Sequence, residues 1–235
     1  MAARDRYESL KGLSGAVIAV LWLDVVLQVL YVLSSVSVIG YMGDLLSGAA
    51  VVTEESPDYS PAEIVQLIVA MLSTLVTVSL YFMIGRWIFR AAWNLRHLGA
   101  KRLEYTPGWS VGWYFVPFAN LVMPFRAMRE IWLASHEPAR WREASVGTLT
   151  LWWTLWLAGN ILGNISFRMA MGAETLEEMI RAEWIGLALC AFNIPLSLVF
   201  MGIVRRVREA QDRSITLVPP PGQPDLPDDL VTAAV

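Results

Sequence analysis

The chain has 235 residues, of which 56% are apolar and 17% are charged, and its formal net charge is −3. Soluble domains carry about 25% charged residues, so this composition excludes an ordinary soluble enzyme, a disordered chain and a disulfide-rich secreted scaffold. The slightly negative net charge argues against nucleic acid as a partner. The sequence therefore predicts an all-α, polytopic membrane protein whose surroundings are the lipid bilayer.

Four stretches are long and apolar enough to cross a bilayer, whose hydrocarbon core of about 30 Å requires about 20 residues of helix. The predicted spans cover residues 13–39, 64–89, 146–167 and 184–204. Together they predict a transmembrane domain over residues 13–213. Residues 1–12 precede it, and a Pro-rich, acidic tail over residues 214–235 follows it and is expected to be disordered.

The distribution of Lys and Arg residues favours four spans over five. With four spans and an inner N-terminus, the three inner segments carry three, nine and four basic residues, and only Arg168 and Arg181 lie outside. With five spans, eight of the 18 basic residues would lie outside. Because basic residues concentrate on the cytoplasmic side, we expect a four-helix bundle with both termini in the cytoplasm.

The segment 107–135 is apolar at its start but differs from a span. Its charge-free stretch, residues 109–123, has only 15 residues and is interrupted by Pro117. We expect this stretch to be re-entrant or interfacial. Gly112 would allow a close approach, and Pro124 would begin an amphipathic helix. Asn120 would either cap a helix or satisfy backbone groups freed by Pro117.

The sequence in and around this segment contains the most specific motif of the chain. It reads RWIFRAAWNL at residues 86–95, PGWSVGWYFVPFANLVMPFRAMREIW at residues 107–132, and LWWTLWLAGNI at residues 151–161. It resembles a bacterial membrane-protein family catalogued as domain of unknown function 4328. The resemblance implies a multi-span bacterial membrane protein and supplies no reaction, substrate or cofactor. The residues that carry the motif are Arg86, Arg90, Asn94, Pro107, Gly108, Trp109, Gly112, Trp113, Pro117, Asn120, Pro124, Glu130 and Trp132.

Two features of this cytoplasmic motif have alternative interpretations. The tryptophans of this region form either an interfacial aromatic belt or an aromatic-lined pocket capped by the Pro/Asn loop. They are Trp87, Trp93, Trp109, Trp113, Trp132 and Trp141. Arg86 and Arg90 either extend to lipid phosphates or provide an ion-pair partner for Glu130.

Polar residues also occur inside the predicted spans, where they are costly. By counting helical rise, Asp24, Asn160 and Asn193 fall near the middle of the bilayer, with Asn164 one turn beyond Asn160. One interpretation is structural: Asp24 donates to Asn160 or Asn193, and the Gly159-x-x-x-Gly163 pattern brings helices together. The other is a ligand-binding cavity formed by Asp24, Asn160, Asn164 and Asn193.

Signals of catalysis and of metal binding are weak. The sequence contains one cysteine, Cys190, and two histidines, His97 and His136, without a metal-ligand or nucleophile motif. We therefore expect no cofactor and no enzyme activity. The predicted function is an interaction, scaffold or regulatory subunit of the bacterial inner membrane, with a membrane-protein partner or a second copy. The alternative is a small-ligand or lipid-binding, transporter-like protein.

Overall fold

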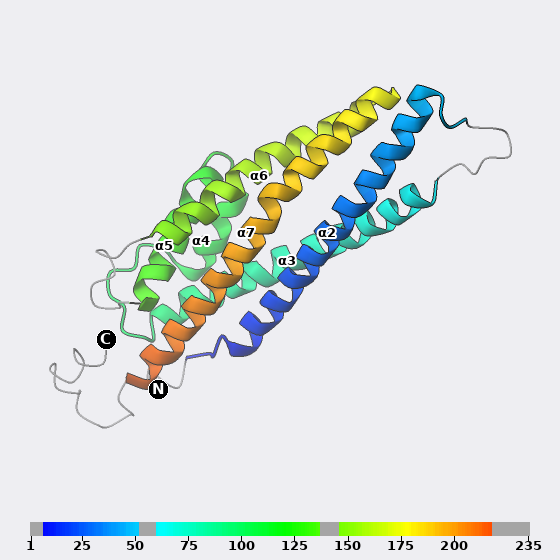
Figure 1. Ribbon diagram of the computed structural model, residues 1–235. Coiled ribbons are helices and arrows are strands. Elements are labelled where there is room, and N and C mark those ends of the chain that lie inside the picture. The colour runs from blue at the N-terminus through cyan, green and yellow to red at the C-terminus, as the bar shows by residue number, and fades with distance from the viewer. Residues whose placement is uncertain (1–6, 52–59, 137–145, 218–235) are drawn as a thin grey trace. The chain divides into compact units, whose positions relative to one another are not determined.

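A computed structural model describes residues 7–51, 60–136 and 146–217. Four long helices dominate it, and shorter helical segments follow the second of them (Figure 1). In chain order, the elements are α2 (Lys11–Ser47), α3 (Pro61–Leu95), α4 (Pro107–Gly112), the 3-10 turns η1 (Trp113–Phe115) and η2 (Ala119–Leu121), α5 (Met123–His136), α6 (Gly147–Gly172) and α7 (Leu176–Leu217).

The described residues confirm the all-α class. Within them, three helices, α2, α3 and α7, are long and apolar enough to cross a membrane. The fourth predicted span corresponds to α6, which has 26 residues but is not among those three. Three threonines and two asparagines interrupt the apolar sequence of α6.

The long helices continue beyond the predicted spans. The largest extension is in α7, whose 42 residues correspond to about 63 Å, about twice the bilayer core. The predicted spans include only the apolar part of each helix. Flanking Arg, Glu and Gln residues also have high helix propensity, so the helix continues through them. The predicted tail begins at residue 214, but α7 continues to Leu217; residues 218–235 of the predicted tail lie outside the described part.

The chain divides into two compact units. The first unit comprises Met1–Ile18, Phe82–Thr150 and Met201–Val235. In it, Gly85 of α3 faces Val111 of α4, where an added Cβ would lie 3.5 Å from a Val111 methyl carbon. The amphipathic α5 buries its apolar side, as its sequence predicts. The largest buried apolar side chains of this unit are Leu10, Trp87, Ile88, Leu95, Met128, Ile131, Leu133, Leu149 and Ile203.

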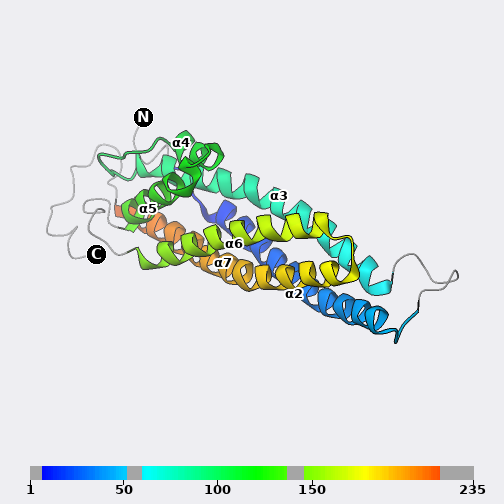
Figure 2. The same cartoon turned by 90° about the horizontal axis from the view of Figure 1, so that it is seen from above.

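The second unit comprises Ala19–Tyr81 and Leu151–Phe200. Its segments of α6 and α7 lie side by side in both views (Figures 1 and 2). A Cβ at Gly159 would lie 2.9 Å from Asn193 Oδ1, so the predicted small-residue stripe does allow close helix approach. Large apolar side chains face outward on this unit, including Leu33 and Leu75, and a bilayer would cover such a surface.

Candidate binding cleft in the first unit

A cleft of about 390 Å³ lies against the C-terminal part of α3. Helical periodicity brings its lining residues together, since positions three and four apart share one face of a helix. The opposite face of this part of α3 is apolar and buried, through Ile88, Ala91 and Leu95. The cationic and aromatic side chains are therefore turned outward. The lining residues are Glu8, Arg86, Phe89, Arg90 and Trp93.

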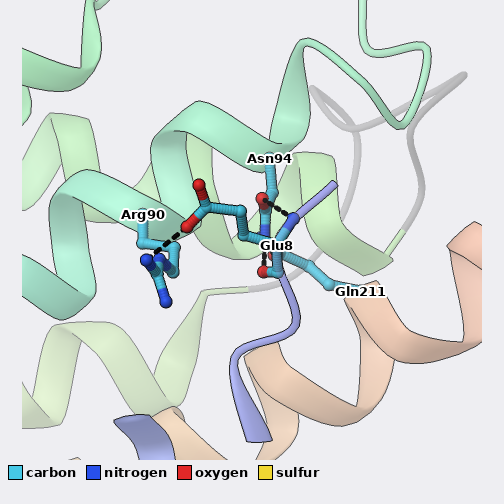
Figure 3. A network of polar contacts seen from close by, with 4 residues as sticks. All are labelled: Glu8, Arg90, Asn94 and Gln211. Carbon is cyan, nitrogen blue, oxygen red and sulfur yellow. Dashed lines mark hydrogen bonds and ion pairs between the residues drawn. The ribbon is translucent and has the colours of Figure 1, made fainter. Parts of the chain in front are cut away.

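The two arginines of the cleft differ in what they contact. Arg90 forms an ion pair with the carboxylate of Glu8 (Figure 3). Arg86 is exposed and forms no ion pair with any residue that the structure describes. Phe89 and Trp93 stack beside them, with ring centroids 6.4 Å apart and planes 13° apart. The cleft thus combines two guanidinium groups, one carboxylate and two aromatic faces.

The backbone of Glu8 is held in place by Asn94, which is fully buried on α3 (Figure 3). Asn94 Oδ1 accepts the N–H of Glu8 at 3.2 Å, and Asn94 Nδ2 donates to the carbonyl of Glu8 at 2.9 Å. The same Nδ2 donates to Gln211 Oε1 at 3.0 Å. This side chain therefore joins three separated stretches of the chain and positions Glu8 over the cleft.

Three further hydrogen bonds hold buried polar groups of this unit. Gln211 of α7 is fully buried, and its Nε2 donates to the carbonyl of Ala91 and to Ser135 Oγ, both at 3.0 Å. The indole N–H of Trp87 donates to Ser14 Oγ at 2.9 Å. Buried polar groups are costly without partners, so this satisfied network favours one arrangement of the unit.

The predicted ion pair between Glu130 and Arg86 or Arg90 is wrong. Glu130, which is only 4% exposed, accepts hydrogen bonds from the backbone N–H groups of Glu104 and Tyr105. Arg90 pairs with Glu8 instead. The correction has a physical reason: a carboxylate buried on α5 binds the chain segment packed over it, whereas both arginines lie on the outward face of α3.

Burial raises the pKa of Glu130 above its ordinary value of 4.5, although the two backbone hydrogen bonds oppose the effect. The native state therefore holds this proton more tightly than the unfolded state. Its stabilising contribution is complete below pH 4.5 and is lost as pH rises through the raised native pKa. We expect Glu130→Gln to show a smaller loss of unfolding free energy than the unmodified protein between acid and neutral pH, measured by thermal denaturation.

The control for this experiment is Glu209→Gln, which removes an exposed carboxylate of the same unit. It should keep the pH dependence of the unmodified protein. An unaltered pH dependence in Glu130→Gln would show that the Glu130 carboxyl has the same pKa in the native and unfolded states.

The structure places the rest of the motif in a broken helical segment. Thr106 caps α4 by accepting the N–H of Trp109 at 3.3 Å, a role that the sequence had predicted for Asn120 at another helix. Asn120 lies in η2, where its backbone N–H donates to Val116, and no side-chain cap is formed there. Pro117 lies between η1 and η2, and Pro124 is the second residue of α5, as expected for a helix start.

Trp93 of the motif lines the cleft, whereas Trp109, Trp113 and Trp132 do not. Trp141 lies outside the described residues. Trp109 and Trp113 contact each other, with centroids 4.6 Å apart. Gly112 allows this packing, since an added Cβ would lie 3.2 Å from the Trp109 ring. Trp132 is largely buried in α5, 4.5 Å from the His136 ring. The aromatic walls of the cleft come instead from Phe89 and Trp93 of α3.

The four polar residues predicted near mid-membrane are not hydrogen-bonded to one another. Asp24 Oδ2 accepts from Gln28 at 2.7 Å and from Ser197 at 3.0 Å, so the predicted bond to Asn160 or Asn193 is wrong. Asn160 is exposed and donates to the carbonyl of Trp156. The physical reason is the position of Asn160 around the helix. Because Gly159 of α6 faces α7, the next residue, Asn160, points away from α7.

The remaining two asparagines are also used locally. Asn164 is exposed and accepts from Arg168 Nε at 2.9 Å. Asn193 packs over Gly159. The predicted cavity of Asp24, Asn160, Asn164 and Asn193 is thus not assembled.

Sequence reasoning missed two groups of residues. Glu8 and Gln211 lie in polar segments near the ends of the chain, where the sequence gives no sign of a specific role. Their role appears only in the contacts that each makes with Asn94. In the second unit, Glu183 accepts from Tyr31, Ser35 and Gln66 at 2.8–3.3 Å. A polar residue within an apolar run, such as Gln66, was the available signal for this second group.

These features define a class: an all-helical protein with helices of membrane-spanning length and composition, and a polar, aromatic cleft on the first unit. Residues 52–209, two thirds of the chain, match the family described as domain of unknown function (DUF4328), and the chain belongs to it. The resemblance predicted from the motif is thereby confirmed. Searches of curated proteins and of solved structures found no match.

Proposed function

We propose that the protein is an integral protein of the bacterial inner membrane that acts by binding rather than by catalysis, as an interaction or regulatory subunit. The observation that carries this proposal is the cleft of the first unit, which stays open beside a fully hydrogen-bonded polar network. Asn94, Gln211 and Glu130 serve to hold the chain in place. Among the described residues, Arg86, Phe89 and Trp93 around the cleft are exposed and available to a partner, whereas Arg90 pairs with Glu8.

The proposed topology has four spans with both termini in the cytoplasm. It includes α6, because its 26 residues correspond to about 39 Å, more than the bilayer core requires. Three basic residues up to and including Lys11, nine between residues 86 and 142 and four after residue 204 then lie on the inner side. The cleft is cytoplasmic in this topology.

A transporter-like role built on a mid-membrane polar site has less support. Asp24 is bonded to Gln28 and Ser197, which favours a role in helix packing. The exposed position of Asn160 and Asn164 favours contact with something outside the unit. Both observations favour an interaction protein.

Native mass spectrometry of the protein, released gently from its own membrane at natural abundance, tests the proposal. We expect a discrete added protein mass or a fixed multimer. Trp93→Ala should lose at least half of this complex, because Trp93 forms a wall of the cleft. Trp184→Ala, which removes an exposed indole from the second unit, is the matched control and should keep it. A monomer without partners, before and after chemical crosslinking, would refute the proposal.

A further inference from the structure

We propose that the cleft on α3 binds a phosphate ester through Arg86 and Arg90, and that the Glu8 carboxylate occupies the position of a phosphate oxygen when the ligand is absent. The inference rests on the proposed function, which places binding at this cleft. It adds the chemistry of the ligand and an internal competitor.

The two arginines of the cleft are placed to bind one phosphate group together. Arg86 and Arg90 are one helical turn apart, a spacing that puts two planar guanidinium groups on the same side of α3. Such a pair matches a tetrahedral phosphate, whose oxygens accept forked hydrogen bonds from both groups. A carboxylate is the protein group that most resembles this acceptor, and Arg90 already binds one, that of Glu8. Arg86 has no ion-pair partner among the described residues.

The cleft is large enough for a molecule bigger than a phosphate group. Its volume of about 390 Å³ lies within the range of about 300–1,000 Å³ that is typical of small-molecule sites. A phosphate group alone would leave much of this space empty. Phe89 and Trp93 line the remainder and are 44% and 40% exposed, so they offer apolar faces to the organic part of an ester. An ester therefore fits the lining better than a free inorganic anion.

The backbone of Glu8 is fixed, whereas its side chain is free to move. Its backbone is fixed on both sides by Asn94, at 3.2 and 2.9 Å, while its side chain is 54% exposed. The carboxylate can thus leave Arg90 by side-chain rotation without release of the backbone. Its departure replaces one negative charge by the larger charge of a phosphate monoester, about −1.5 to −2 at neutral pH, or by the single charge of a diester.

Two sources supply this chemistry: a lipid headgroup and a soluble phosphate ester. The apolar run of α3 ends directly before Arg86, a position at which arginine side chains reach lipid phosphates. Soluble esters would reach the same cleft from the aqueous side. Both sources require Arg86 and compete with Glu8.

The test uses the full-length protein in a maltoside detergent, which contains no phosphate, with and without added phosphatidylglycerol. Retained phosphatidylglycerol is counted by native mass spectrometry. Inorganic phosphate and glycerol phosphate are titrated separately into the detergent-solubilised protein by calorimetry. Arg86→Gln is the principal variant, because Arg86 has no ion pair to lose and the fold is expected to survive.

We expect Arg86→Gln to weaken binding of the effective probe about tenfold, as expected for loss of one charge-assisted hydrogen bond. Arg205→Gln is the matched control, because it removes an exposed arginine of the same unit outside the cleft, and it should leave binding within about twofold. Equal losses in both variants would mean general charge attraction and would overturn the proposal. Absence of binding by every probe would overturn it as well.

Glu8→Gln tests the competitor. It should tighten binding several-fold, because the carboxylate that occupies Arg90 is gone. Glu209→Gln removes the same charge from an exposed position of the unit outside the cleft and should have no effect. Unchanged or weaker binding by Glu8→Gln would refute a role of Glu8 as competitor.

The probes distinguish the source of the ligand. Retention of phosphatidylglycerol alone identifies a lipid headgroup, whereas saturable binding of glycerol phosphate identifies a soluble ester, and either supports the proposal. Failure here also differs from failure of the proposed function. A protein that keeps its membrane partner but binds no phosphate ester would still be an interaction subunit with a different ligand.

Discussion

Replacement of Asn94 by leucine should lower the free energy of unfolding by about 3 kcal/mol, because several buried polar groups lose their partners at once. Leucine has nearly the same size but cannot bond the N–H and C=O of Glu8 or the Oε1 of Gln211. Thermal denaturation in detergent should show a fall of roughly 10 °C in the melting temperature. Asn94→Asp should also destabilise, since it removes both donated bonds while keeping the acceptor.

Asn160→Leu is the matched control for this experiment. It makes the same substitution at an exposed position of α6, where only a local bond to Trp156 is lost. Its melting temperature should stay within about 2 °C of the unmodified protein. Equal shifts in the two leucine variants would contradict the role assigned to Asn94.

Gly186→Ala should destabilise the second unit by about 2–3 kcal/mol, through overpacking against Tyr31. An added Cβ at Gly186 would collide with the Tyr31 hydroxyl, and it would lie 3.2 Å from Cζ of the same ring. The ring would have to move, and its hydroxyl would leave Glu183, to which it now donates at 3.3 Å. The measurement is again thermal denaturation of the purified protein.

Gly202→Ala, in the same helix, is the control for Gly186→Ala, because nothing lies within 4 Å of the added Cβ. It should be neutral or stabilise by up to about 1 kcal/mol, as alanine favours helix over glycine. Tyr31→Phe removes the atom closest to the new methyl group and should restore part of the stability of Gly186→Ala. Additive effects of the two substitutions would show that Gly186 and Tyr31 are not coupled.

Local features of the sequence explain which parts of the fold could be predicted. Long apolar runs, and prolines such as Pro117 and Pro124, act through the residues next to them, so the helices and the break between them were predictable. The ends of the helices were harder to predict, because polar residues with good helix propensity continue a helix beyond its apolar part. The outward orientation of Asn160 follows from helix periodicity once the glycine stripe is assigned to the contact with α7.

The candidate site was predictable only in part. The face that carries Arg86 and Arg90 follows from their spacing on one helix. The residues that complete the site do not, because Glu8 lies 86 positions from Asn94 and Gln211 lies 117 positions beyond it. Gln211 stands in a charged sequence typical of an exposed helix, yet it is fully buried. Such pairings depend on the complete tertiary arrangement, which spacing along one sequence does not contain.

The discontinuous first unit has a consequence for the order of synthesis. Its three stretches leave the ribosome at separate times, and Gln211 is made 117 residues after Asn94. At about 5–20 residues per second, this delay is on the order of 10 s. During that interval the side chain of Asn94 lacks its α7 partner and the Ser135 hydroxyl lacks Gln211. The polar core of the unit therefore closes only after the C-terminal part of α7 has been made.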